Sequence, residues 1–196
     1  MHLVFDIFQG IGIAAAVGIR PFLPALVVGA LAAGNVELHF SHTSYSFLQS
    51  WPFLLVMVIG AVALAMVERR LGRQRSEGRE LVVVLGVVAA VLGALFFAGS
   101  LARAGDAAWP GWIGGIICAA IAVAATRPLF ARVRARLDAD AARAVPLYAE
   151  GLAVALGALS VLAPPVGLIG LALLVWLLVG GRRREGQKYA GLRILR

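Results

Sequence analysis

Long apolar runs separated by short polar or basic segments dominate this chain. Most of the runs approach the length of about 20 residues with which an α-helix crosses a bilayer. The pattern predicts an all-α protein, a polytopic membrane helix bundle of about six transmembrane helices, in a single integral membrane domain over residues 1–196. The predicted spans cover residues 3–33, 51–67, 81–101, 111–125, 147–163 and 166–180.

Composition supports the same class. Hydrophobic residues make up 61% of the 196 positions and the mean hydropathy is +0.91, whereas soluble domains hold roughly 45–50% apolar residues. The net charge of +8 would point to nucleic acid in a soluble protein. Here the basic residues flank apolar runs, so membrane topology and anionic lipid headgroups account for them better.

All but two of the 18 Lys and Arg residues fall into three clusters that share one face if six helices alternate. Because cytoplasmic loops are rich in Lys and Arg, that face is predicted to be cytoplasmic. Trp51, Trp109 and Trp112 begin spans on the opposite side, as expected for Trp at the outer headgroup level. We therefore expect a multi-pass protein of the inner (cytoplasmic) membrane with both termini in the cytoplasm. The clusters occupy residues 69–79, 127–143 and 182–196, and the two exceptions are Arg20 and Arg103.

The first apolar run is too long for a simple span. Its 31 residues would form a helix of about 46 Å, against a hydrocarbon core of about 30 Å. Pro21 and Pro24 each remove a backbone donor, which predicts a helix broken at Arg20-Pro21 into halves over 3–19 and 22–33. The run then forms either one kinked span or a re-entrant hairpin, and the hairpin would place the N-terminus outside.

Arg20 is the main functional candidate, because a guanidinium at bilayer depth costs at least roughly 2.5–3.5 kcal/mol on insertion scales. Half-helix ends in the membrane form substrate sites in several transporters. The leading hypothesis is a small transporter or channel-like protein for an anionic solute or lipid headgroup, with Arg20 as the anion contact. The alternative is a non-transporting scaffold or partner subunit in which Arg20 forms a structural ion pair with one of the three acids near or inside apolar runs, Asp6, Glu68 or Glu150. The candidate substrate-binding residues are Gly18, Arg20, Pro21 and Pro24, with Glu150 or Asp6 as the resting counter-ion.

Three further features concern the architecture. Residues 129–145 place Leu129, Val133 and Leu137 on one face, which predicts an amphipathic helix on the inner leaflet that ends at Pro146.

Residues 10–23 weakly resemble residues 117–130, which suggests an inverted repeat. Small residues before the break, and the GxxxG motif of Gly111 and Gly115, favour close packing of helices within one chain.

The sequence contains no phosphate-binding loop, zinc-protease motif or nucleophile elbow, so we expect no enzyme activity. His39 and His42 with Glu37 are too few ligands for a metal site, and Cys118 is the single cysteine. No metal and no cofactor are therefore expected. The expected partners are membrane lipids, with anionic headgroups at the basic inner face, an anionic small molecule and a second copy of the chain in a homo-oligomer. Nucleic acid is not expected.

The segment Gly-Ile-Gly-Ile-Ala-Ala-Ala-Val-Gly-Ile-Arg-Pro-Phe-Leu-Pro over residues 10–24, together with Lys-Tyr-Ala-Gly-Leu-Arg over 188–193, resembles an uncharacterised bacterial integral-membrane family. This is the domain-of-unknown-function family 4126. The resemblance implies a small multi-span protein and no activity, so no catalytic or binding residue is carried over from it. Members of the family have more acidic residues after the second span than this chain, which has Glu68 there.

Overall fold

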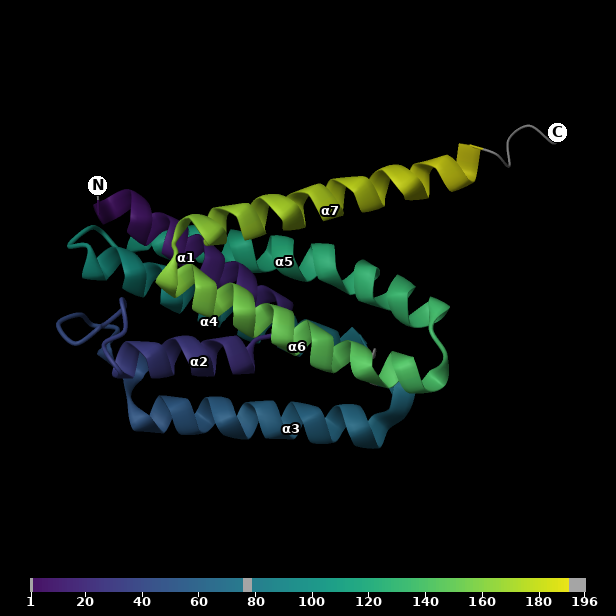
Figure 1. Ribbon diagram of the computed structural model, residues 1–196, viewed down its shortest axis with the longest axis horizontal. Coiled ribbons are helices and arrows are strands. Elements are labelled where there is room, and N and C mark those ends of the chain that lie inside the picture. The colour runs from purple at the N-terminus through teal and green to yellow at the C-terminus, as the bar shows by residue number, and fades with distance from the viewer. Residues whose placement is uncertain (1, 76–78, 191–196) are drawn as a thin grey trace.

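The computed structural model describes residues 2–75 and 79–190 (Figure 1). Within these residues the chain forms seven α-helices and one short 3-10 helix, and it contains no strand. The predicted all-α bundle is confirmed. The helices are α1 (His2–Ile19), α2 (Phe22–Ala33), η1 (Ser46–Gln49), α3 (Trp51–Arg75), α4 (Arg79–Arg103), α5 (Trp109–Arg136), α6 (Ala139–Leu162) and α7 (Pro165–Ala190).

Helix α1 is the centre of the bundle and packs against α2, α4, α5, α6 and α7. Its residues 13–17 are completely buried. Close approach depends on small side chains, because a Cβ on Gly12 would lie 2.4 Å from the Cα of Gly167 on α7, and one on Gly18 would lie 2.6 Å from the carbonyl oxygen of Ala119 on α5. Helices in lipid gain stability from such tight packing rather than from hydrophobic burial.

The GxxxG motif of α5 packs against α4. A Cβ on Gly111 would lie 2.6 Å from the backbone of Ala98, and a Cβ on Gly115 would lie 2.3 Å from the carbonyl oxygen of Gly93. The prediction that small residues pack helices together within the chain is confirmed.

The predicted break after α1 is also confirmed. The Arg20 N–H still donates to the Ala16 carbonyl oxygen at 3.2 Å, but Pro21 has no N–H to continue the helix. Helix α2 restarts at Phe22 and buries Pro24 in its first turn, a position that proline tolerates because its missing N–H would have no helical partner there.

Helices α1 and α2 form a hairpin rather than one kinked span. Helix α1 begins at the same end of the bundle as the 34–50 segment and runs to the break in the interior of the bundle, from where α2 turns back (Figure 1). The start of α1 and the end of α7 therefore lie at opposite ends of the bundle. The prediction of two cytoplasmic termini counted residues 3–33 as one crossing, whereas the structure has a hairpin there.

The direction of α1 also shows whether the predicted inverted repeat of residues 10–23 and 117–130 is present. Gly10 of α1 and Gly114 of α5 both lie against Phe97, and farther along Gly18 of α1 lies against Ala119 and Ala122 of α5. The two helices therefore run parallel, and residues 10–23 and 117–130 are not related by inversion. Pro128 moreover lies inside a continuous α5, whereas Pro21 ends α1.

The separate amphipathic helix expected over residues 129–145 is absent from the described chain, and that prediction was wrong. Helix α5 continues to Arg136, and α6 begins at Ala139 and contains Pro146 in its interior. The boundary falls at Asp138, whose side chain accepts a hydrogen bond of 2.8 Å from the Ala141 N–H. This N-cap satisfies a free donor of the first turn and fixes the start of α6.

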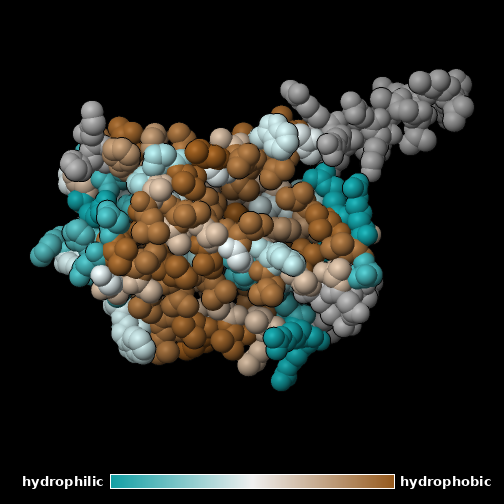
Figure 2. Space-filling model, viewed as in Figure 1, coloured by the Kyte–Doolittle hydropathy of each residue, from teal (hydrophilic) through white to brown (hydrophobic). Residues whose placement is uncertain are grey.

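The outer surface of the bundle is apolar. Four helical stretches are long and apolar enough to cross a membrane, namely Trp51–Arg70, Glu80–Arg103, Trp109–Arg136 and Ala144–Leu162, and three shorter apolar helices cover Leu3–Ile19, Phe22–Ala33 and Pro165–Gly181. Figure 2 shows hydrophobic residues over the middle of one face and hydrophilic residues gathered at its two ends. Because soluble monomers rarely expose large contiguous apolar patches, the protein is a membrane-embedded helical bundle.

The described parts of the three basic clusters lie together at one end of this bundle. The end of α3, the start of α4, the turn between α5 and α6, and the end of α7 share that end (Figure 1). We refer to it as the basic end. The opposite end holds the 34–50 segment and the turns between α4 and α5 and between α6 and α7, and we refer to it as the loop end.

Candidate functional site

Arg20 lies where three helices meet. Its Nη1 is 2.6 Å from Oε1 of Glu68 on α3, and its Nε is 3.7 Å from Oε1 of Glu150 on α6. The three side chains are 14%, 28% and 21% exposed, respectively. One guanidinium is thus shared by two carboxylates, and the cluster carries a formal charge of −1.

Glu150 has an incompletely satisfied carboxylate. Its Oε2 is buried and has no hydrogen-bond partner among the described residues. An ionised carboxylate can only accept hydrogen bonds, so an oxygen that has left water without meeting a donor raises the free energy of the folded state. A proton on this oxygen would remove the negative charge and supply a donor.

The cluster lies toward the basic end rather than at the middle of the bundle. Glu68 comes 17 residues after Trp51, the first residue of α3, which is about 25 Å along a helix. Arg69 and Arg70 follow it directly and begin the first basic cluster. Arg20 therefore occupies the inner part of the apolar region, close to the polar zone.

The structure separates the candidate site residues predicted from the sequence. Glu150 is a counter-ion of Arg20, as predicted. Asp6 is not, because it lies 14 residues earlier on α1, about 21 Å away along the helix. Gly18 contacts α5 and Pro24 is buried in α2, so both have packing roles, while Pro21 forms the break that leaves Arg20 at the helix end.

Glu68 was one of the three acids considered as ion-pair partners of Arg20, but it was not among the predicted substrate-binding residues. Its signal in the sequence is its position as the first acid after the apolar run of α3. Without the hairpin of α1 and α2, nothing in the sequence indicates that the end of α3 and the end of α1 meet.

A second polar cluster lies at the loop end. Asp6 is buried and forms an ion pair with Nη2 of Arg103, the last residue of α4. The same Nη2 lies 3.5 Å from Oε1 of Gln9, and Nη1 donates to the Glu37 carbonyl oxygen at 2.7 Å. Gln9 in turn donates to the Val161 carbonyl oxygen on α6 at 3.2 Å.

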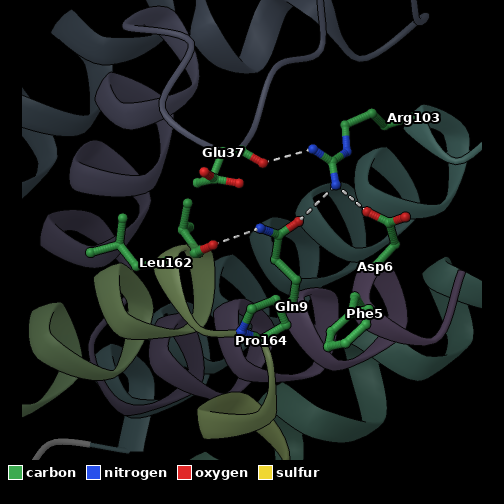
Figure 3. Close-up of a pocket in the computed structure, with 8 residues that line it drawn as sticks. Phe5, Asp6, Gln9, Glu37, Arg103, Leu162 and Pro164 are labelled. Atoms are coloured by element: carbon green, nitrogen blue, oxygen red, sulfur yellow. Dashed lines mark hydrogen bonds and ion pairs between the residues drawn. The ribbon is translucent and has the colours of Figure 1, made fainter. Parts of the chain in front are cut away.

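These groups surround a pocket of about 330 Å³, which we call the loop-end pocket (Figure 3). The polar groups come from α1, α4 and the 34–50 segment, and apolar residues from α1, from the end of α6 and from the turn after it complete the wall. The lining residues are Phe5, Asp6, Gln9, Glu37, Arg103, Val161, Leu162 and Pro164.

Glu37 sits in an unusual backbone conformation. Its φ is +55°, and the Leu38 N–H donates to the Val36 carbonyl oxygen at 2.6 Å across it, which makes a γ-turn. A non-glycine residue with positive φ costs of order 1–3 kcal/mol. The turn directs the Glu37 carbonyl oxygen at Arg103 and holds the residue at the pocket.

The fold and its two charge clusters define a small polytopic helical membrane protein with ion pairs at both ends of its central helix. A family model, described as a domain of unknown function (DUF4126), matches residues 7–184. The chain belongs to this family. Searches of the curated proteins and of the solved structures each found no match.

Proposed function

We propose that this protein is a small membrane transport protein that moves protons, with the cluster of Arg20, Glu68 and Glu150 as its protonation site. The observation that carries the proposal is the buried Oε2 of Glu150, which has no hydrogen-bond partner among the described residues. The cluster has one more carboxylate than guanidinium, so a single bound proton makes it neutral.

The geometry favours a proton over the anionic solute expected from the sequence. An anion at Arg20 would have to displace two carboxylates and enter a cluster of charge −1. Like charges at ion-pair distance repel each other. A metal cation needs several oxygen ligands, and within residues 2–75 and 79–190 no group of three or more His, Cys, Asp or Glu residues is arranged to hold one.

A path between the two ends of the bundle follows α1 and α6. Gln9 and Ser160 lie between these helices near the loop end, and Arg20 and Glu150 lie between them near the basic end. Between the two pairs, Gly157 of α6 faces Ala16 of α1 and Val28 and Pro24 of α2. This contact between α1 and α6 is the route along which we expect protons to move.

The proposal includes an orientation. Since Lys and Arg accumulate on the cytoplasmic side, we assign the basic end to the cytoplasm and the loop end to the outside of a bacterial inner membrane. The protonation site then faces the cytoplasm through the partly exposed Glu68.

Proton flux into proteoliposomes tests the function. The chain is reconstituted with pyranine inside, and a potassium gradient with valinomycin makes the interior negative. We expect acidification several-fold faster than in protein-free liposomes and a return to that background with Glu150→Gln. Glu80→Gln is the matched control, because Glu80 is an exposed acid near the basic end and outside the cluster.

The competing function is a structural one, in which the 2.6 Å contact between Arg20 and Glu68 only fastens α1 to α3. In that case the wild-type chain gives no flux above background in the same assay. An equal flux from the wild-type chain and Glu150→Gln would also refute the proposed site.

A further inference from the structure

The loop-end pocket contains a cationic and an anionic side chain, those of Arg103 and Glu37, that have hydrogen-bonding capacity left for a ligand. Arg103 makes three hydrogen bonds, one from Nη1 and two from Nη2, whereas a guanidinium has five N–H donors. Its Nε–H and one Nη1–H lie outside these three contacts. Buried Asp6 already balances the charge of Arg103, so the open donors belong to a neutral ion pair.

Glu37 supplies the open acceptor. Glu37 is exposed and lines the pocket, and its hydrogen bond with Arg103 is made by its backbone carbonyl, which leaves the carboxylate outside that contact. Figure 3 shows Glu37 on one side of the pocket, with Arg103 and Asp6 on the other. Arg103 and the Glu37 carboxylate form no ion pair, so a ligand between them can contact both.

The location of the pocket indicates where such a ligand comes from. Trp51, Trp109 and Trp112 are exposed at the same end of the bundle, and Trp residues prefer the headgroup level of a bilayer. Phe5 and Leu162 are exposed at the pocket wall, where they can contact the first carbons of an acyl chain.

We propose that the loop-end pocket binds a phosphoethanolamine group, with the phosphate at an open N–H donor of Arg103 and the ammonium at the Glu37 carboxylate. Each charge of this zwitterion meets an opposite charge in the pocket. Because the group is neutral overall, its binding leaves the net charge of the pocket unchanged. A volume of about 330 Å³ lies at the small end of the range for ligand pockets, roughly 300–1,000 Å³. The ligand is a lipid headgroup or the same group free in solution, and the inference does not depend on proton transport.

Ligand-dependent thermal unfolding of the full chain in detergent tests the inference. The probes are dihexanoyl phosphatidylethanolamine, the corresponding phosphatidylcholine and phosphatidylglycerol, and soluble glycerophosphoethanolamine. A ligand that binds only the folded state raises the Tm. We expect the phosphatidylethanolamine to raise it by several degrees at the lowest concentration, because the choline group has no N–H to donate to Glu37 and phosphatidylglycerol has no cation.

Glu37→Gln removes the charge of Glu37 and keeps its backbone contact with Arg103. We expect this variant to bind phosphatidylethanolamine at least tenfold more weakly, with phosphatidylglycerol unchanged, and the control Glu80→Gln to behave as wild type. If Glu37→Gln does not fold, Glu37→Asn replaces it, because Asn tolerates positive φ.

The outcomes are distinct. An equal response to glycerophosphoethanolamine would support the zwitterion and assign its source to the solution, while a response to the lipid alone would assign it to the membrane. No preference for phosphatidylethanolamine, or an unchanged affinity in the Glu37 variant, would overturn the inference.

Discussion

At the scale of single residues, the central feature is one guanidinium held by two carboxylates. Arg20 was recognisable in the sequence because a cation inside an apolar run needs a counter-ion, and Glu150 was recognisable as one of three nearby acids. That Glu68 and Glu150 rather than Asp6 pair with Arg20, and that Asp6 pairs with Arg103, could not be predicted. Both depend on which end of α1 faces which end of the bundle. No Lys or Arg precedes Arg20, so the positive-inside rule does not orient α1.

Replacing Arg20 by Ala leaves two acids facing each other. Breaking a fully buried ion pair from one side costs roughly 3–5 kcal/mol, and we expect about 2–4 kcal/mol here because water reaches part of the cluster. Unfolding of purified protein by titration with a denaturing detergent measures the change. Arg69→Ala, at an exposed neighbouring position, is the control, and an equal loss in both variants would show that the ion pairs contribute little.

At the scale of elements, the hydrophobic pattern predicted the five later helices, because each apolar run formed one helix. The first run failed this rule. Proline removes a donor wherever it stands, so Pro21 and Pro24 located the break, but the angle between the two halves depends on packing. Helix α1 fits between α4, α5, α6 and α7 through its small residues, and this fit turns α2 back toward the loop end.

The hairpin makes a topological prediction. In a Cys118→Ala background, single cysteines at Leu3, His39 and Leu137 are labelled with a membrane-impermeant maleimide in intact and in opened cells. We expect Leu3→Cys and His39→Cys to react from the outside and Leu137→Cys only after opening, because the first two lie at the loop end and Leu137 in the turn between α5 and α6. If Leu3→Cys, like Leu137→Cys, reacts only after the cells are opened, residues 3–33 cross the membrane once as a single kinked span and the hairpin is contradicted.

At the scale of the whole molecule, the bundle has an apolar middle and two unlike polar ends. The gathering of the Lys and Arg clusters at one end was predicted from the sequence, because the clusters follow alternate apolar runs. The loop-end pocket was not predictable, since its polar residues come from positions 6, 9, 37 and 103 and meet only through the hairpin. The two ends are therefore suited to different tasks, with protonation near the basic end and headgroup binding at the loop end.

The central claim is that Glu150 takes up a proton in the folded protein. Infrared difference spectroscopy of the chain in lipid, between neutral and acidic buffer, observes this directly as the C=O stretching band of a carboxylic acid. We predict a band that is missing in Glu150→Gln and retained in Glu80→Gln. A difference spectrum that is the same in the wild-type chain and in Glu150→Gln would contradict the account.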